Sequence, residues 1–201
     1  MKRLWIGLAY FLGSLPSGYL IFRLREKKDI RSYGSQSTGA TNVLRLKGWR
    51  WAIPVAVVDV LKSALPVWFA LRSFPADRWV AFGVAFMVVL GHCFPVFIKF
   101  RGGKGVATAM GAFAVLSTGP FLFSLAVFGG VVAATRYVSL GSLLAALSFP
   151  LIVFFWRGDM GLALLGLTLF VLIALRHSGN IKRLVKGEER KLGQKASAGK
   201  A

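Results

Sequence analysis

The sequence predicts an all-α integral membrane protein with seven transmembrane helices. Hydrophobic residues make up 56% of the 201 residues, and the mean hydropathy of +0.64 is high for a soluble domain of this length. The apolar residues gather in seven runs, separated by short polar breaks. Lipid cannot satisfy an open backbone, and the alternating pattern of a membrane β-barrel is absent, so each run is predicted to be a helix.

In chain order, the seven runs are predicted to span Leu4–Phe22, Trp51–Leu71, Trp79–Phe100, Val106–Thr118, Phe121–Thr135, Leu140–Trp156 and Met160–Leu175. From the second run to the sixth, the residues that break each run are Ser73–Pro75, Arg101–Gly105, Gly119–Pro120, Arg136–Tyr137 and Arg157–Asp159. Several runs are shorter than the ~20 residues of a standard span, so we expect short or tilted helices. No linker or repeat divides the chain, which predicts one domain over residues 1–201, with 176–201 as a cytoplasmic tail.

Lysine and arginine are distributed unevenly between the connections. With seven spans, one side of the membrane receives 20 of them, in segments 23–50 and 99–105, at position 136 and in the tail, and the other side receives five. Because basic residues favour the cytoplasmic side, the N-terminus is predicted to lie outside and the C-terminus in the cytoplasm.

Charge and composition exclude several classes of protein. The formal net charge of +19 lies between apolar runs rather than along one face, so we expect the lipid bilayer as a partner and no nucleic acid. Cys93 is the only cysteine, which excludes an intramolecular disulfide and disfavours a cysteine-based metal site. His92 and His177 are the only histidines, which disfavours zinc. We therefore expect neither a metal nor a cofactor.

The chain is organised around a polar segment, Asp29–Arg50, between the first two runs. Its candidate ligand residues are Ser35, Gly39, Thr41, Asn42 and Arg45. Small hydrogen-bonding side chains, a flexible backbone and positive charge together suit a phosphate. Residues Thr41–Lys47 can form a short interfacial helix whose N-terminus faces that phosphate. For this segment alone, a solvated loop that only sets the membrane orientation is the alternative.

A second polar segment, Phe100–Gly105, leads into the fourth run. Its glycines, Gly102, Gly103 and Gly105, can present backbone N–H groups, and the start of the following helix adds the positive end of its dipole. Lys104 adds a full charge. The spacing of a Walker A loop is missing, and a flexible tight turn is the alternative.

A third polar segment follows the seventh run. His177 can act as an acid, a base or a phosphate ligand, or it can cap the helix C-terminus. Asn180 follows at once, and Glu188 either orients a cation at the site or is solvated. Ser142, early in the sixth run, can cap that helix or line the site. All of these segments fall on the predicted cytoplasmic side, which is the main indication of a shared site.

Asp59 and Lys62 lie inside the second run. Their spacing of three places them on one helical face. Ionisable residues within a membrane are costly and mark a functional or architectural site, and a neutralising pair between helices is the plainer alternative. His92, late in the third run, is expected to pack between helices rather than to catalyse.

Four segments carry a family resemblance: GSLPSGYL (13–20), DIRSYGSQSTGATNVLR (29–45), GHCFPVFIKFRGGKGVATAMG (91–111) and RHSGNIKRLVKGEE (176–189). Together they resemble the bacterial acyl-phosphate-dependent glycerol-3-phosphate acyltransferases, the PlsY family. The resemblance covers nearly the whole chain, in order. One departure is visible, because the family often reads GSGN-x-GATN and Gln36 and Ser37 replace its Gly-Asn here.

The resemblance implies an enzyme of the bacterial cytoplasmic (inner) membrane whose site faces the cytoplasm. The implied reaction transfers a fatty acyl group from acyl phosphate to the sn-1 hydroxyl of glycerol 3-phosphate. The products are lysophosphatidic acid and phosphate, in the first step of phospholipid synthesis. A monomer is expected. The alternative is a membrane transporter of a phosphorylated solute, which predicts a basic site near the bilayer midplane and an inverted repeat.

For that reaction, the catalytic residues are predicted to be Ser35, Arg45, Lys104, His177 and Asn180. The substrate-binding residues are predicted to be Gly39, Thr41, Asn42, Gly102, Gly103, Gly105, Ser142 and Glu188. The donor to the developing oxyanion is Arg45, Lys104 or Ser35. The general base is either His177 or a substrate phosphate. The phosphate is favoured, because neighbouring phosphates stabilise a protonated histidine, which cannot accept a proton.

Overall fold

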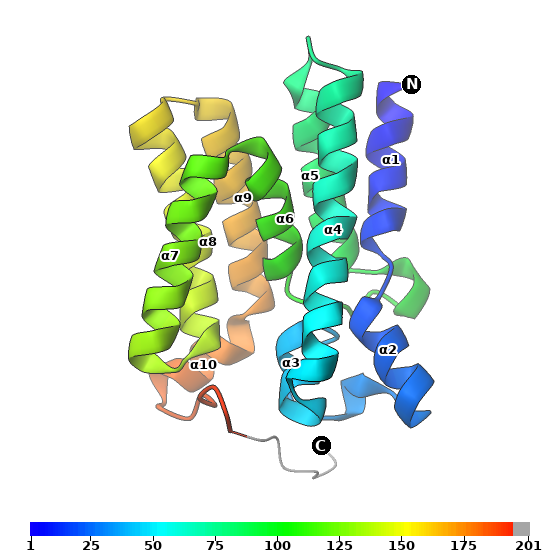
Figure 1. Ribbon diagram of the computed structural model, residues 1–201, viewed down its shortest axis with the longest axis vertical. Coiled ribbons are helices and arrows are strands. Elements are labelled where there is room, and N and C mark those ends of the chain that lie inside the picture. Colours follow the sequence, from blue (N-terminus) through cyan, green and yellow to red (C-terminus); the bar gives the residue numbers. More distant parts are fainter. Residues whose placement is uncertain (195–201) are drawn as a thin grey trace.

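The computed structural model describes residues 1–194, and every regular element in that range is helical (Figure 1). The α-helices are α1 (Lys2–Gly13), α2 (Ser17–Glu26), α3 (Ala40–Lys47), α4 (Trp49–Ser73), α5 (Arg78–Cys93), α6 (Val106–Leu116), α7 (Thr118–Thr135), α8 (Val138–Ile152), α9 (Met160–Arg176) and α10 (Ser178–Val185). Two 3-10 turns, η1 (Ile30–Ser32) and η2 (Val96–Ile98), and one π turn, η3 (Val153–Arg157), complete the set. The all-α prediction is confirmed.

Five helical segments of the described range are long and apolar enough to cross a membrane: Lys2–Glu26, Trp49–Ser73, Arg78–Ile98, Thr118–Thr135 and Val138–Arg157. A sixth is added if α9 and α10, which meet at an angle of 67°, are taken as one broken span. α6 is a shorter apolar helix. Each predicted run therefore corresponds to one of these segments, while the number of full crossings and their orientation stay predictions.

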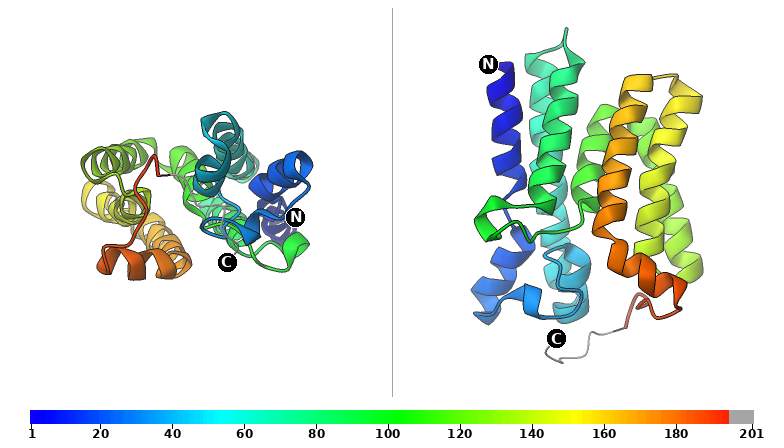
Figure 2. Two further views of the ribbon diagram at one scale, coloured as in Figure 1. Left: turned by 90° about the horizontal axis from the view of Figure 1, so that it is seen from below. Right: turned by 180° about the vertical axis from the view of Figure 1, so that it is seen from behind.

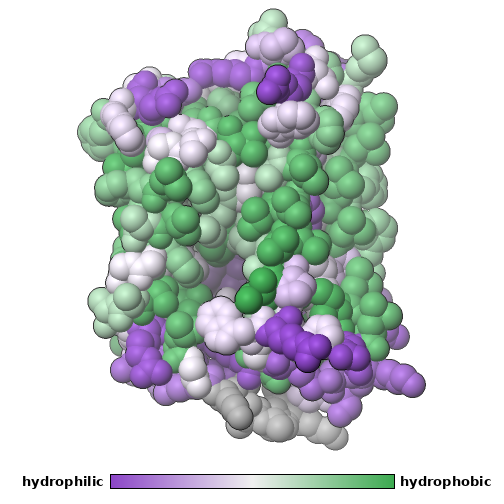
Figure 3. All heavy atoms as spheres, in the orientation of Figure 1, coloured by the Kyte–Doolittle hydropathy of each residue, from purple (hydrophilic) through white to green (hydrophobic). Residues whose placement is uncertain are grey.

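Large hydrophobic side chains cover the outside of the bundle. Figure 3 shows them as a broad band on one face, with hydrophilic residues gathered at the upper and lower ends. Exposed examples lie on different helices: Leu61 and Leu65 on α4, Leu122 on α7 and Leu164 on α9. An apolar band between two polar ends suits a chain surrounded by lipid.

The first predicted run is broken in the structure. α1 ends at Gly13 and α2 begins at Ser17, because Pro16 lacks an N–H and restricts the residue before it. Gly13 allows α1 to lie directly on α5, since a Cβ there would overlap the carbonyl oxygen of Val88. The sequence pattern does not predict this break, because the apolar residue Leu15 continues the run up to the proline.

α6 joins two groups of helices. On one side α1, α4 and α5 pack together, and on the other side α7, α8 and α9 do (Figure 1). Gly111 of α6 approaches α4 so closely that a Cβ would overlap the carbonyl oxygen of Val60. Phe113, two residues later, stacks on Phe149 of α8 with ring centroids 3.6 Å apart. One short helix, α6, therefore packs against both groups of helices at the centre of the molecule.

The segments with predicted site residues gather in the lower half of the molecule as drawn in Figure 1. These segments are α3 with the loop before it, the α5–α6 connection, and α10 with the residues after it, and the two further views of Figure 2 show the same arrangement. The short helix expected at Thr41–Lys47 is confirmed as α3.

Candidate active site

A cavity of about 340 Å³ lies in this lower half. It brings together ten of the predicted site residues: Ser35, Gly39, Thr41, Asn42, Arg45, Lys104, Gly105, Ser142, His177 and Asn180. The three that do not line it are Gly102, Gly103 and Glu188. The side chains with hydroxyl, carboxylate or imidazole groups that line it without having been assigned to the site are Ser37, Asp59, His92, Ser139 and Glu189.

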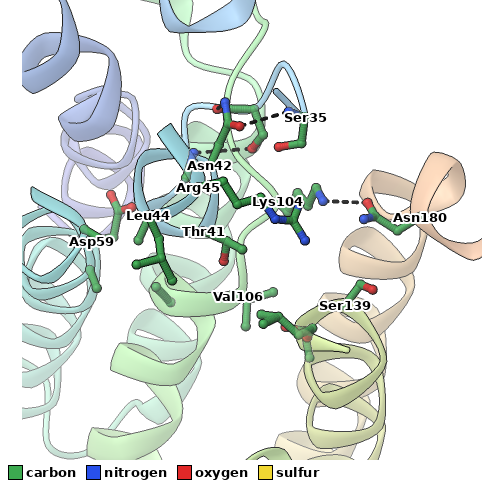
Figure 4. A pocket seen from close by; sticks show the side chains of 18 of the residues that line it. Ser35, Thr41, Asn42, Leu44, Arg45, Asp59, Lys104, Val106, Ser139 and Asn180 are labelled. Atoms are coloured by element: carbon green, nitrogen blue, oxygen red, sulfur yellow. Dashed lines mark hydrogen bonds between the residues drawn. The ribbon is translucent and has the colours of Figure 1, made fainter. Parts of the chain in front are cut away.

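Asn42 shapes the loop that carries Ser35. Its side-chain oxygen accepts a hydrogen bond from the Ser35 N–H at 2.9 Å, and its amide nitrogen donates to the carbonyls of Tyr33 and Ser37 at 3.1 and 2.9 Å. These bonds engage the whole amide, so Asn42 organises the loop from inside. The hydroxyls of Ser35 and Thr41 form no hydrogen bond within residues 1–194, which leaves them available in the cavity (Figure 4).

Lys104 lies across the cavity from that loop. Its Nζ donates to the side-chain oxygen of Asn180 at 2.5 Å, so the second and third predicted segments meet directly (Figure 4). Burial lowers the pKa of Lys104 to about 8; Glu189 opposes that shift, and Arg45 adds to it. The lysine is therefore a cation at neutral pH, and its hydrogen-bond partner, the Asn180 amide, carries no opposite charge.

The glycines before Lys104 differ in their roles. A Cβ at Gly103 would overlap the ring of His92, and one at Gly102 would overlap the His92 carbonyl oxygen. Arg176 donates to both glycine carbonyls, at 3.1 and 3.2 Å. These two glycines therefore serve close packing outside the cavity rather than the phosphate-facing position that the sequence predicts for them.

Gly105 does line the cavity. Its φ of +84° favours glycine, and the residue ends the loop directly before α6 begins at Val106. No side chain caps this helix, so the N–H groups of its first turn lie at the cavity wall with the positive end of the helix dipole. Gly105 therefore lies at the cavity, and its binding of a phosphate stays a prediction.

His177 lies at the bend between α9 and α10. Its Nδ1 lies 2.8 Å from the carbonyl oxygen of Ile173. Because a carbonyl oxygen only accepts, Nδ1 carries the proton, and in the neutral ring Nε2 is left as the acceptor. His177 therefore ends α9 and lines the cavity, while its role as an acid, a base or a phosphate ligand stays a prediction.

Glu189, and not its neighbour Glu188, is the glutamate that lines the cavity. Glu188 is exposed, whereas the Glu189 side chain is 1% exposed. Oε1 accepts from Asn180 at 2.7 Å and from Ser139 at 3.1 Å, and Oε2 accepts from Arg183 at 2.8 Å. Burial alone raises the pKa of Glu189, but the hydrogen bonds outweigh burial and hold that pKa below its usual value. The carboxylate therefore stays charged and orients Asn180 toward Lys104.

The chain after α10 crosses back over the cavity. Arg45 of α3 lies 3.8 Å from Glu189 Oε1 and donates to the carbonyl oxygen of Arg190 at 3.2 Å. Leu192 then pairs with Arg136 through two hydrogen bonds, of 2.7 and 2.8 Å. Residues 189–192 therefore connect the α3 side of the cavity to the turn between α7 and α8.

Comparison with known proteins gives the family. A sequence model described as glycerol-3-phosphate acyltransferase matches residues 3–187. This chain belongs to the glycerol-3-phosphate acyltransferase family.

Relatives of this acyltransferase cover it almost end to end. It is 41% identical to the glycerol-3-phosphate acyltransferase of Syntrophotalea carbinolica, over 90% of this chain and 92% of the relative. It is 43% identical to that of Geobacter sulfurreducens, over 90% and 93%. The crystal structure of PlsY (YgiH), an integral membrane glycerol 3-phosphate acyltransferase, in its glycerol 3-phosphate form matches with a TM-score of 0.91, 38% identity and 96% coverage of both chains. The lysophosphatidic acid form matches with a TM-score of 0.88. The predicted family is confirmed, and the chain is a membrane-embedded acyltransferase.

One departure of this acyltransferase from the family pattern lies in the Ser35 loop. Gln36 adopts a φ of +58°, in the left-handed region, where the family often has glycine. Gln36→Gly should raise the free energy of unfolding by roughly 0.5–1 kcal/mol, since the left-handed conformation costs a non-glycine residue more than glycine loses in chain entropy. Thermal unfolding in detergent measures this. Gln36→Ala, which keeps the Cβ, is the control and should show no gain; an equal gain in both variants would contradict the explanation.

Proposed function

We propose that this acyltransferase transfers a fatty acyl group from acyl phosphate to the sn-1 hydroxyl of glycerol 3-phosphate, with lysophosphatidic acid and phosphate as products. We place it in the bacterial cytoplasmic membrane with the cavity facing the cytoplasm. The observation that carries the proposal is that Arg45 and Lys104 converge on one cavity, part of whose wall is apolar. The PlsY structures in glycerol 3-phosphate and lysophosphatidic acid forms support the choice of acceptor and product.

Two phosphate groups have to lie close together in this reaction. The cavity offers the cations of Arg45 and Lys104, the hydroxyls of Ser35 and Thr41, and the N–H groups at the start of α6. Glu189 is turned toward Asn180, Ser139 and Arg183, so its charge is compensated at the rim. Cations and donors around a common space suit two anions that would repel each other in water.

The acyl chain is accommodated by the apolar part of the wall. Residues of that part come from α3, α4, α6 and α7: Leu44, Ile53, Ala56, Met110, Phe128 and Val132. Figure 3 shows a hollow in the middle of the face, between the hydrophobic surfaces of α4 and α7. An acyl chain that already resides in lipid reaches the polar end of the cavity through this opening.

The chemistry needs no covalent enzyme intermediate. The glycerol oxygen attacks the acyl carbonyl carbon, the bond from that carbon to the phosphate oxygen breaks, and the electron pair leaves with phosphate. The proton of the hydroxyl passes to a phosphate oxygen, which becomes more basic as the bond breaks. Holding both substrates in this geometry lowers the barrier by roughly 7–11 kcal/mol in favourable cases, so positioning by the chain is the main contribution.

His177→Gln tests the source of the base. If a substrate phosphate accepts the proton, the glutamine variant should keep turnover at saturating substrate within about tenfold of wild type, because general base catalysis contributes about 10²–10⁴-fold. Its KM for glycerol 3-phosphate should rise, since the imidazole Nε2 of His177 is no longer present to bind the substrate. Steady-state phosphate release measures both constants. A loss of turnover above about 10²-fold with unchanged KM would assign the base to His177 instead.

Activity should fall at alkaline pH. The pKa of Lys104 is lowered to about 8 by burial, so the lysine is charged below that pH and neutral above it. The ratio kcat/KM for glycerol 3-phosphate, which reports the free enzyme, should therefore decline above about pH 8. The second phosphate ionisation lies near pH 6 and does not interfere. In Lys104→Arg the decline should move upward, because arginine stays charged; an unchanged profile would exclude Lys104 as its source.

The decisive assay uses purified protein in detergent with acyl phosphate and glycerol 3-phosphate. Phosphate release should depend on glycerol 3-phosphate, and one lysophosphatidic acid should form per phosphate released. Phosphate release that proceeds equally without the acceptor would overturn the proposed reaction. Replacing acyl phosphate by acyl-CoA or acyl carrier protein should give no product, which tests the proposed donor.

A further inference from the structure

A buried polar cluster lies beside the cavity, where α4 and α5 meet the break between α1 and α2. We call it the Lys62 cluster; its members are Ser17, Asp59, Lys62 and His92. Lys62 Nζ lies 2.8 Å from Asp59 Oδ1 and donates to His92 Nδ1 at 2.9 Å. Ser17 donates to Asp59 Oδ1 at 2.6 Å. The predicted pair on one face of the second run is thus present, with partners on two other helices.

The cluster satisfies each of its charges internally. The Lys62 and Asp59 side chains are 6% and 1% exposed. The third contact of Lys62 is the carbonyl oxygen of Leu15, at 2.9 Å, in the break between α1 and α2. Such a group of charges in an apolar region is costly and is retained for function or architecture. Here it connects α2, α4 and α5 at one point.

His92 connects the cluster to the glycine loop. Its carbonyl oxygen accepts from the Gly103 N–H at 3.0 Å, and its ring occupies the space that a Cβ on Gly103 would need. The ring cannot move aside freely, because Lys62 holds its Nδ1. Gly103 immediately precedes Lys104, so the position of the imidazole determines where the lysine backbone begins.

The start of α2 connects the cluster to the other loop. Ser17, the first residue of α2, is bound to Asp59, and the next residue is Gly18. A Cβ at Gly18 would overlap the carbonyl oxygen of Thr38, so the loop that carries Ser35 rests on this turn of helix. The same cluster therefore contacts the supports of both loops that border the cavity.

We infer that the Lys62 cluster sets the distance between the Ser35 loop and the glycine loop, and that His92 is a positioning residue for Lys104. This inference rests on the proposed function, which assigns the two loops to the two phosphates. His92 touches neither phosphate in this role; it acts through Gly103. The requirement accounts for a histidine eleven positions before Gly103 in the segment from Gly91.

A double-mutant cycle on His92 and Gly103 tests the inference. Gly103 lacks a positive φ, so alanine is acceptable to its backbone, and the nearest obstacle to a Cβ is the His92 ring. Gly103→Ala should lower kcat/KM for glycerol 3-phosphate by about 10²-fold, the loss expected for a displacement of about 1 Å. His92→Ala should lose about tenfold. The double variant should be no worse than His92→Ala, because the added methyl group then has room, and residues in contact are not additive.

The pH profile distinguishes positioning from simple loss of stability. In Gly103→Ala the alkaline decline of kcat/KM should move to higher pH, because a displaced Lys104 is less buried; the double variant should restore the wild-type profile. Gly7→Ala on α1 is the matched control, since a Cβ there meets nothing within 4 Å, and it should behave as wild type. Thermal unfolding is measured for every variant.

Losses that multiply in the double variant would overturn the inference, as would wild-type activity in Gly103→Ala. If Gly103→Ala alone does not fold, recovery of folding in the double variant supports the same contact, and failure of both to fold overturns it. A wild-type protein that releases phosphate without glycerol 3-phosphate would instead overturn the proposed function. The two failures are therefore distinguishable.

Discussion

Lys104→Met should reduce turnover by about 10²–10³-fold while the protein stays folded. Removing one donor to the charge that develops in an acyl transfer costs about that much. Methionine keeps the volume and the apolar stem of lysine and removes only the cation. Because the Asn180 side chain stays bound to Glu189 through its amide nitrogen, the cavity wall should persist. Phosphate release at saturating substrates and thermal unfolding together measure the effect.

Lys182→Met is the control for the Lys104 variant. Lys182 lies on α10, carries the same charge on the same side of the molecule and is exposed. Its replacement should leave turnover within about twofold of wild type, because exposed charges contribute little beyond screened attraction. Equal losses in the two variants would show that general positive charge, rather than the buried cation, supports the reaction, and would remove Lys104 from the site.

Glu189→Gln should lower both activity and stability. The variant keeps the shape of the side chain but removes the charge that accepts from Asn180, Ser139 and Arg183. Hydrogen bonds to a buried charged group contribute about 1.5–3 kcal/mol each, so we expect a free energy of unfolding lower by about 2–3 kcal/mol. Asn180 is then free to turn, which should lower kcat/KM by about 10²-fold.

The adjacent carboxylate provides the matched control. Glu188→Gln removes the same charge one position away, where the side chain is exposed. It should leave both the unfolding midpoint and kcat/KM near wild type, because surface substitutions change stability by about 0.5 kcal/mol or less. If Glu188→Gln were the more damaging variant, the arrangement of the chain after α10 would differ from the one described.

The long helices of this fold follow from the pattern of its apolar runs. α4 and α8 are predictable because each run ends at residues that lipid or a helix disfavours, and α3 is the short helix expected at Thr41–Lys47. The break before Pro16 was not, since Ser14 and Leu15 extend an otherwise apolar run and its cause lies partly in packing against α5.

The site was predictable where its residues act through their own chemistry. Lys104 and Arg45 were recognisable as cations in glycine-rich polar segments, and the structure brings both to the cavity. For Gly102 and Gly103 the sequence predicts phosphate-facing positions, whereas in the structure both pack against His92. That contact joins two segments of the chain and cannot be inferred from the spacing of the glycines. The sequence alone does not distinguish Glu188 from Glu189, because the positive φ of Gly187, which turns the chain after α10, cannot be inferred from two consecutive glutamates.

The crossing of residues 189–192 over the cavity has a consequence for how this enzyme is made. A nascent chain that has left the ribosome as far as α6 already holds Arg45 and Lys104. It holds neither the carboxylate that orients Asn180 nor the segment that ties Arg45 to the turn at Arg136. We therefore expect catalytic competence to arise abruptly, once the chain past residue 192 has emerged. Prematurely terminated chains should insert into the membrane as inert proteins.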